Sequence, residues 1–293
     1  MLEKFLDHLR LEKRFSSHTL TSYETDLRQL NEFLETEYDG TAIADSSHEM
    51  LRSWIVEMVE HGRNPKTINR KISSIKSFFK WGKKYRGIKT DPTQKIVLPK
   101  ISKRLPVYVE ESQMETLLDY SVFPDTYEGQ RDELIIDLFY QSGMRCAELM
   151  NLKEKDISYG NHTVKVLGKR NKERLIPIGD ELAVKILAFT QIATDFTAPA
   201  PEKYLFATAK GAKLYPKLVY RIVNNYLTKV SALRKKSPHV LRHSFATHML
   251  NRGADLNAIK EILGHASLAA TQVYTHNSIE KLKEIHRKSH PNG

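Results

Sequence analysis

The feature that most constrains this chain is a strongly basic segment whose apolar residues recur with helical spacing. Residues 63–104 contain 14 Lys or Arg and a single acid, Asp91. Apolar residues within this segment follow one another at intervals of four, three and four, which predicts a helix over 64–85 with one packed face. The segment therefore belongs to a folded domain rather than to a disordered basic tail. The apolar positions are Ile68, Ile72, Ile75 and Phe79.

The opposite face of this predicted helix carries cations and hydroxyl groups. A charge run is most often a solvated surface, but one acid among 42 residues favours contact with phosphate groups. We therefore expect this face to bind a nucleic-acid backbone. At 100° per residue, the residues on it are Lys66, Arg70, Ser77 and Lys84, with Ser73 and Lys80 beside them.

Composition excludes several classes of protein. The chain has 293 residues and a net charge of +11, which indicates two domains and an anionic partner. Its one cysteine, Cys146, excludes a disulfide framework and a cysteine-based zinc site, and it favours a reducing compartment. The first residues lack the apolar core of a signal peptide, and no run of 18 apolar residues occurs. We expect a cytoplasmic protein without membrane contact.

Three further helical patterns precede the basic helix. The second follows a cap signal at Ser16, and the third ends at Gly62. With the basic helix they predict a four-helix domain over residues 1–90, followed by a proline-punctuated basic linker over 91–105. The three patterns lie at 2–9, 20–34 and 51–59.

The second predicted domain, residues 106–293, changes its period part-way. An apolar helical stripe over 134–139 stops at Gly143, and Arg145 opens the next helix. Two β-like runs then bracket a hairpin tip at 168–172, and helical patterning resumes after them. The sequence thus predicts a mainly α fold in two domains, the second being α+β with a small β-hairpin sheet. The β-like runs are 163–167 and 174–178.

Several familiar motifs are absent from the sequence. There is no GxxxxGK[ST], GxGxxG or HExxH, so nucleotide binding and zinc hydrolysis lack their usual sequence support. His239, His243 and His248 cluster in the sequence, but without a nearby acid or thiol they favour hydrogen-bonding roles over a metal site. We expect neither a metal nor a cofactor.

The densest chemical signal is the run PHVLRHSFATH at 238–248. If Pro238 starts a helix, His239 and Arg242 share a face at its first turn, where backbone N–H groups and the helix dipole favour an anion. Leu241 and Phe245, four residues apart, would then face the core.

The motifs HVLRHSFATHML, ILGH and VYTH, preceded by SGMRCAELMNL and VLGKRNKERLIPI, resemble those of the tyrosine recombinases, most nearly the Xer-type resolvases of chromosome dimers. The resemblance covers nearly the whole chain. It implies an N-terminal SAM-like core-binding domain and a tyrosine-recombinase catalytic domain. It also implies site-specific recombination of double-stranded DNA through a covalent 3′-phosphotyrosine and a Holliday junction, without metal or ATP.

The resemblance assigns six catalytic residues, which the motifs place residue by residue. Two arginines would grip the non-bridging oxygens of the scissile phosphate. A lysine directly after Gly168 would protonate the leaving 5′-oxygen, although Lys172 on the same hairpin stays open as an alternative. Two histidines would bond the phosphate or accept the tyrosine proton, and a tyrosine would be the nucleophile. The set is Arg145, Lys169, His239, Arg242, His265 and Tyr274.

Smaller features complete the sequence interpretation. Glu148 either orients Arg145 or is a surface acid, and Lys235 and Lys236 lie in a second acid-free patch that we expect to contact DNA. An apolar stripe over 279–285 marks a tail helix, which either docks on its own domain or, as the resemblance implies and we hypothesise, is donated to a neighbouring protomer.

The implied partners are a DNA recombination site and other recombinase protomers. The protomers would form a homo-oligomer or a hetero-tetramer with a paralogous recombinase, and a cell-division DNA translocase would be a further partner. Three alternatives stay open: an integrase or invertase of a mobile element with the same chemistry, a type IB topoisomerase-like enzyme, and a non-catalytic DNA-binding protein on the same scaffold.

Overall fold

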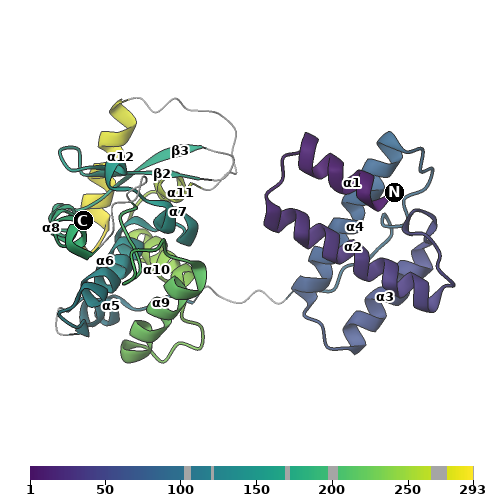
Figure 1. Cartoon of the computed structure of the whole chain (residues 1–293), viewed down its shortest axis with the longest axis horizontal. Coiled ribbons are helices and arrows are strands. Elements are labelled where there is room, and N and C mark those ends of the chain that lie inside the picture. The colour runs from purple at the N-terminus through teal and green to yellow at the C-terminus, as the bar shows by residue number, and fades with distance from the viewer. Residues whose placement is uncertain (102–106, 120–121, 169–171, 197–203, 265–275, 293) are drawn as a thin grey trace. The chain divides into compact units, whose positions relative to one another are not determined.

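A computed structural model describes this chain except residues 102–106, 120–121, 169–171, 197–203, 265–275 and 293, and except the side chains of 193–196 and 276–281. The chain divides into two compact units, Met1–Arg104 and Leu105–Gly293 (Figure 1). Among the described residues, no helix is both long enough and apolar enough to cross a lipid bilayer.

The first unit is helical, and its helices begin at the cap residues that the sequence offers. The side chain of Ser16 accepts a hydrogen bond from the backbone N–H of Thr19, and that of Asn64 accepts one from Lys66 just after Pro65. The predicted helices are confirmed, including the one over 64–85. The elements are α1 (Leu2–Asp7), which continues as a π-helical turn (His8–Glu12), α2 (Ser17–Glu37), a 3₁₀ turn (Ile43–Asp45), α3 (His48–Glu60) and α4 (Pro65–Tyr85).

The apolar stripe of α4 lies at the centre of this unit's core. All four of its predicted apolar residues are fully buried. At the end of the apolar pattern on α3, Met58 is buried and the following Val59 is 52% exposed. Beyond α4 the chain stays packed on this unit, since Ile96 joins the same core.

A buried carboxylate ties α2 to the basic helix. Asp26 is 0% exposed and accepts a hydrogen bond from Ser74 at 2.8 Å, while the Lys71 ammonium lies 3.3 Å from its other oxygen. The guanidinium of Arg70 binds the same carboxylate. Two cations of the basic segment are therefore used inside the domain, where they compensate a charge that would be costly to bury alone.

The second unit surrounds one largely buried helix, α6, with shorter helices and a small sheet. Helix α6 packs against helices α8 and α10. Helices α11 and α12 lie beside strand β3 (Figure 1). The helices are α5 (Glu111–Leu117), α6 (Tyr127–Ser142), α7 (Cys146–Asn151), a 3₁₀ turn (Glu154–Asp156), α8 (Asp180–Phe196), α9 (Pro216–Val230), α10 (Pro238–Asn251), α11 (Leu256–Leu263) and α12 (His276–Ser289).

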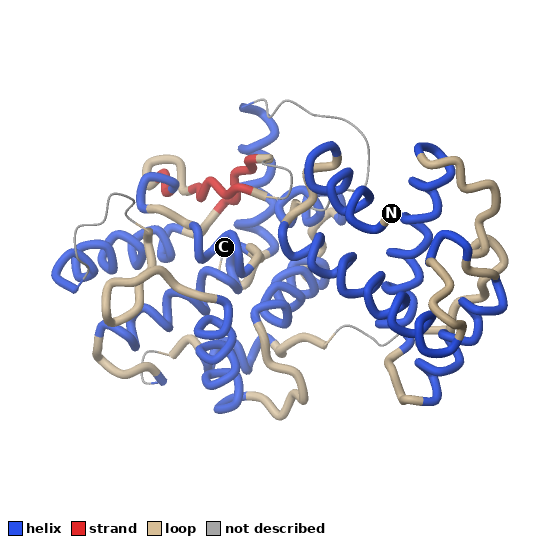
Figure 2. Tube along the Cα trace, turned by 45° about the vertical axis from the view of Figure 1, so that its right-hand side comes forward, coloured by secondary structure: helices blue, strands red, loops and turns tan. Residues whose placement is uncertain are grey.

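The strands, drawn in red in Figure 2, form one antiparallel sheet. Their order in the sheet is β1 (Ile157–Ser158), β2 (Thr163–Leu167) and β3 (Glu173–Pro177). The predicted hairpin of β2 and β3 is confirmed, and β1 is too short to show a period in the sequence. Val164 pairs with Ile176, and Val166 pairs with Arg174. Because side chains alternate across a strand, this register places Arg174 on the same buried face as Ile176.

Helix α6 ends at Gly143, as its glycine predicts. Gly143 has a φ of +58°, the left-handed conformation that glycine adopts without strain. A Cβ at this position would lie 2.6 Å from the Phe245 side chain and 2.7 Å from that of Leu263. The missing side chain therefore lets α10 and α11 approach the end of α6 closely.

The C-terminal helix α12 packs on its own unit, the second one. Leu282 is buried, and the Nε2 atoms of His286 and His290 lie 2.7 and 3.1 Å from the carbonyl oxygens of Gln141 and Tyr140. These carbonyls belong to the last turn of α6, where a helix leaves its acceptors unpaired. The tail is thus docked on its own unit in this structure of a single chain, and its donation to a neighbouring protomer stays a prediction.

Candidate functional site

The site is built around Arg145, which occupies the turn between α6 and α7. Its backbone N–H donates to Glu148 Oε2 at 2.7 Å and its Nη1 donates to Glu148 Oε1 at 2.9 Å, so one carboxylate caps the helix and fixes the arginine. Its Nη2 donates to the carbonyl oxygen of Gly264 at 2.8 Å. The side chain stays 24% exposed, which leaves the guanidinium accessible from solvent.

Arg242 approaches the same place from the first turns of α10, the helix that begins at Pro238 as predicted. Its guanidinium donates to the carbonyl of Leu263 at 2.7 Å and also to that of Gly143. The residue is only 8% exposed, while Leu241 and Phe245 pack into the core at 0% exposure, as the spacing predicts. The structure therefore brings Arg145 and Arg242 onto adjacent carbonyls of one turn.

A third arginine, Arg174 on β3, completes the cluster, and the sequence interpretation missed it. Its Nη1 and Nη2 donate to the two oxygens of Glu148 at 2.7 and 2.8 Å, and its Nε donates to the carbonyl of Ile262 at 2.7 Å. The sequence did contain a signal for this position. Side chains alternate between the two faces of a strand, so Arg174 lies on the same inward face as Ile176 and Ile178. Of the two interpretations of Glu148, the structure supports the orienting one.

Three successive carbonyl groups hold the three guanidiniums. Ile262, Leu263 and Gly264 end helix α11, where the last carbonyls have no partner within the helix and carry the negative end of its dipole. Each of these carbonyls accepts one arginine. The helix end therefore positions Arg174 together with the two arginines that the resemblance assigns to phosphate binding, Arg145 and Arg242.

The cluster carries more positive than negative charge, and this is visible in its pKa values. Burial, and then the charges of Arg145 and Arg174, lower the pKa of Arg242 to about 10, against the opposing effect of Glu148. Burial alone would raise the pKa of Glu148, but the bonds from Arg174 and Arg145 outweigh it and lower that pKa. Arg242 and Glu148 are thus both ionised at neutral pH, and a bound anion would balance the excess positive charge of the cluster.

The three histidines that cluster in the sequence differ in their exposure. His239, in the first turn of α10, and His243 are exposed, whereas His248 is buried with its Nδ1 at 2.8 Å from the hydroxyl of Tyr140. In the part of the chain that the structure describes, no three His, Cys, Asp or Glu side chains are grouped to hold a metal ion.

Three of the six expected catalytic residues, Lys169, His265 and Tyr274, lie outside the described residues. The positions that flank them are described. Gly168 and Lys172 close the hairpin through a hydrogen bond of 2.8 Å, and Gly264 carries the carbonyl that holds Arg145.

Comparison with known proteins identifies the architecture. Residues 108–281 match the phage integrase family, and residues 2–85 match the phage integrase N-terminal SAM-like domain. The chain belongs to the phage integrase family. Its members are the tyrosine recombinases, so the recombinase class and the two-part fold expected from the motifs are both confirmed.

Curated relatives of this phage integrase family member extend along nearly its whole length. The tyrosine recombinase XerC of Pelobacter propionicus is 37% identical over 291 residues, which cover 99% of this chain and 95% of that protein. The tyrosine recombinase XerC of Pelotomaculum thermopropionicum is 36% identical over 302 residues, which cover 99% and 97%.

Solved structures of the phage integrase family are similar as well. The XerH site-specific recombinase, bound to its palindromic difH substrate in a post-cleavage complex, is 25% identical, with a TM-score of 0.71 over 97% of this chain and 82% of that one. The Tn1549 transposon integrase in complex with circular intermediate DNA shares the fold, with a TM-score of 0.71 at 21% identity over 94% and 96%.

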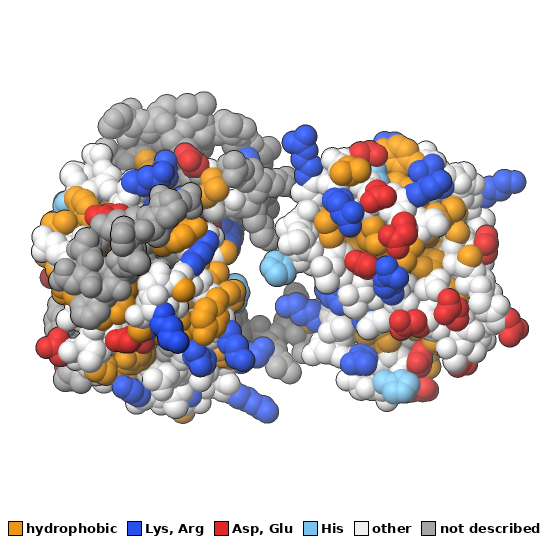
Figure 3. Space-filling view, viewed as in Figure 1, with side chains coloured by type: hydrophobic (Ala, Val, Ile, Leu, Met, Phe, Trp, Pro, Cys, Tyr) orange, Lys and Arg blue, Asp and Glu red, His pale blue; other side chains and the backbone are white. Residues whose placement is uncertain are grey.

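The expected DNA-contacting residues of this family member differ in their exposure and in their bonds to other residues of the chain. Lys66, Lys80 and Lys84 are exposed. On the face that Figure 3 shows, Lys and Arg side chains, coloured blue, lie at the surface of each unit. Arg70 is bound to Asp26. Of the other expected residues, Ser77 is half-buried, and its hydroxyl donates to the Ser73 carbonyl at 3.0 Å. Lys235 is exposed, and Lys236 is partly exposed.

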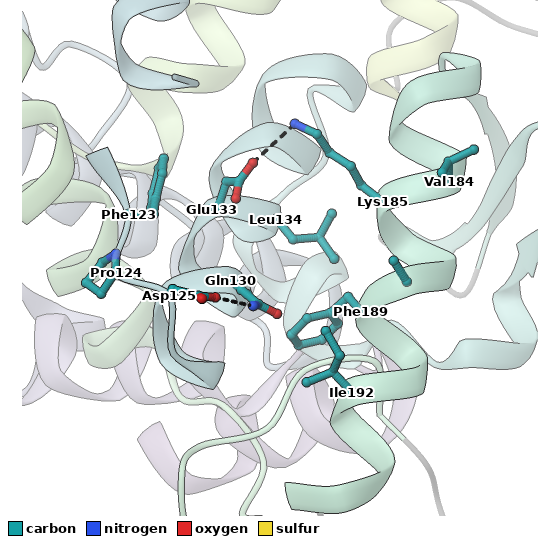
Figure 4. Close-up of a pocket in the computed structure, with 11 residues that line it drawn as sticks. Phe123, Pro124, Asp125, Gln130, Glu133, Leu134, Val184, Lys185, Phe189 and Ile192 are labelled. Atoms are coloured by element: carbon teal, nitrogen blue, oxygen red, sulfur yellow. Dashed lines mark hydrogen bonds and ion pairs between the residues drawn. The ribbon is translucent and has the colours of Figure 1, made fainter. Parts of the chain in front are cut away.

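The catalytic unit also contains a pocket of about 460 Å³ between α6 and α8 (Figure 4). Apolar side chains such as Leu134 and Phe189 line it, with Glu133 and Lys185 paired at 3.2 Å beside them. Glu133 precedes Gly143 by ten residues of sequence, about 15 Å of helix. The pocket is therefore a separate feature from the arginine cluster.

Proposed function

We propose that this phage integrase family member cuts and rejoins DNA at a specific site through Tyr274. Arg145 and Arg242 hold the non-bridging oxygens of the scissile phosphate, because two fixed guanidiniums stabilise the charge that develops there. The observation that carries the proposal is the anchoring of both guanidiniums on the neighbouring carbonyls of Gly264 and Leu263, with Arg145 open to solvent.

The proposed reaction is a phosphoryl transfer without an external energy source. The hydroxyl oxygen of Tyr274 attacks phosphorus, the bond to the 5′-oxygen breaks, and Lys169 gives that oxygen its proton, with Lys172 as the alternative donor. His239 and His265 bond the phosphate or accept the tyrosine proton. The 3′-phosphotyrosine conserves the bond energy, so a 5′-hydroxyl of the partner strand reverses the step and joins the new strands.

The proposed role in the cell is the resolution of chromosome or plasmid dimers. The XerC relatives over almost the full length of the chain and the difH-bound XerH neighbour support this role. Two protomers on each recombination site would make a tetramer, either of this chain alone or with a paralogue, in which α12 leaves its docked position and binds the neighbouring protomer. A cell-division DNA translocase is the proposed activator, and the cytoplasm is the proposed location.

The nucleophile is tested with Tyr274→Phe on a nicked suicide DNA substrate, whose release of a short fragment prevents rejoining. The wild-type chain should accumulate a covalent protein–DNA complex in buffer containing a metal chelator, because the proposed chemistry needs no ion. Tyr274→Phe should bind the same DNA with unchanged affinity and form no complex. A covalent complex from that variant would assign the nucleophile elsewhere.

The DNA site is found by sequencing the fragments that become covalently attached to the wild-type chain in cells. A single sequence near the region where replication ends would support dimer resolution. Fragments from the ends of a mobile element would instead assign the chain to integration.

A further inference from the structure

Arg174 is a buried cation that the proposed reaction does not use. It is 5% exposed and lies in a row whose other inward residues are apolar, among them Val164, Val166 and Ile176. Burying a guanidinium costs several kcal/mol unless it is fully paired. An aliphatic side chain would fill this position of the sheet without that cost, so the guanidinium at this position needs a separate physical reason.

The reason lies in the charge of Glu148. Each oxygen of this carboxylate accepts one bond from Arg145 and one from Arg174. If Arg174 were neutral, Arg145 alone would face the buried carboxylate, and the close ion pair would cancel the charge that Arg145 presents to a phosphate. With Arg174 in place, Glu148 can orient Arg145 while its negative charge is balanced from the other side.

Arg174 also lies against two backbone segments. A Cβ on Gly264 would lie 3.1 Å from Arg174 Nη1, and a Cβ on Gly168 would lie 3.5 Å from the same atom and 3.7 Å from Glu148 Oε1. Both segments therefore run directly against this guanidinium. In the sequence, Gly168 and Gly264 immediately precede Lys169 and His265, two members of the proposed catalytic set.

We propose that Arg174 is a positioning residue for DNA strand cleavage, which neutralises Glu148 so that Arg145 keeps its full charge for the phosphate, and which fixes the turns at Gly168 and Gly264. The inference rests on the proposed function. It assigns to β3 a part in the reaction, although Arg174 itself touches no substrate.

The test is single-turnover formation of the covalent complex on the nicked suicide DNA, with rates expressed per folded molecule and with DNA affinity measured separately. Arg174→Gln should slow cleavage about 10- to 100-fold and leave the dissociation constant for DNA within a factor of about two. Arg174→Lys should recover only part of the rate, because one ammonium group cannot bond both carboxylate oxygens and the Ile262 carbonyl in this geometry.

The double variant Glu148→Gln/Arg174→Gln separates charge balance from simple packing. It removes the unbalanced carboxylate, so it should cleave faster than Arg174→Gln although one more native side chain has been replaced. A merely structural role predicts the opposite order, because the second replacement would add to the effect of the first.

Arg131→Gln is the matched control. Arg131 is also 5% exposed, and it bonds Asp132 and the Ala207 carbonyl at the other end of α6. This variant should lose stability and cleave at the wild-type rate per folded molecule.

Wild-type cleavage by Arg174→Gln, or a double variant slower than Arg174→Gln, would overturn the inference. Failure of the wild-type chain to form any covalent complex would instead refute the proposed function, so the two failures are distinguishable.

Discussion

Arg145 and Arg242 owe their positions to backbone groups that a helix end leaves unpaired. The carbonyls of Gly264 and Leu263 hold the two guanidiniums without neutralising them, because a carbonyl carries only a partial charge. Glu148 is the one carboxylate bonded to Arg145 in the described part of the cluster, and Arg174 shares it. At the scale of single residues, the site thus combines firm placement with excess positive charge.

Gly264 is where this arrangement is most easily disturbed. It has a φ of +62°, and an added Cβ would lie within 3.2 Å of the Arg174 guanidinium. Gly264→Ala should lose about 1 kcal/mol through backbone strain and should also slow covalent-complex formation about 10-fold or more, since the guanidinium must shift. Thermal melting and the suicide-substrate assay measure the two effects.

Gly253→Ala is the matched control for that change. Gly253 has a φ of +85°, but apart from its own chain neighbours nothing lies within 4 Å of the place that an added Cβ would take. This variant should lose stability through the same backbone strain and keep the wild-type cleavage rate. Equal cleavage rates for both alanine variants would contradict the role given to the Gly264 turn.

At the scale of elements, helix α12 is held by imidazoles that stay neutral. Burial lowers the pKa of His286. Burial, and then the repulsion between His286 and His290 when both are protonated, lowers the pKa of His290 well below its usual value, although bonds to the Gln141 and Tyr140 carbonyls act in the other direction. The folded state therefore binds fewer protons than the unfolded state below pH 6.5 or so. The docking of α12 consequently depends on pH.

This linkage predicts that the catalytic unit loses stability in acid. The contribution of the two histidines is fully present above their unfolded pKa, and it falls as the pH drops from about 7 to 5, by up to 1.4 kcal/mol per pH unit for each histidine.

Trp54 and Trp81 both lie in the helical unit, so tryptophan fluorescence follows that unit while circular dichroism follows both. His286→Asn/His290→Asn should flatten the pH dependence, and His239→Asn, at an exposed position, should not. An unchanged slope in the double variant would contradict the assignment.

Elements with a clear period were predictable, and those fixed by tertiary partners were not. The stripe of α4, the stop at Gly143 and the hairpin strands follow from local spacing and from glycine. The buried place of Asp26 and the bonds of Arg174 do not, because a polar residue enters a core only when distant partners satisfy it. Arg145 and Arg242 were assigned through motifs, whereas their shared anchor on the end of α11 needs the folded chain.

At the scale of the whole molecule, charge is distributed unevenly along the sequence. Residues 63–104 carry a net charge of +13, and the preceding 62 residues carry −7. Part of the basic charge is used internally at Asp26, so the number of exposed lysines, rather than the total charge, decides how strongly the chain binds DNA phosphates.

The salt dependence of DNA binding tests this view. Lys66→Gln/Lys80→Gln/Lys84→Gln should weaken binding to all sequences alike and should reduce the slope of log K against log salt by about one unit for each phosphate that is no longer neutralised. Lys4→Gln, an exposed change in the acidic N-terminal part, should leave the slope unaltered. Titrations by fluorescence anisotropy between about 50 and 200 mM salt give the slopes, and an unaltered slope for the triple variant would exclude these lysines from the interface.

A single turn of backbone holds all three guanidiniums, and this gives the reactive centre an all-or-none character. Unwinding the last turn of α11 would release Arg145, Arg174 and Arg242 together, and the freed cations would then repel one another. Half-assembled arrangements are thereby disfavoured. A regulator that stabilised or unravelled this turn would act as a two-position switch rather than as a graded control, and the exposed lysines of α4 in the other unit would not be affected.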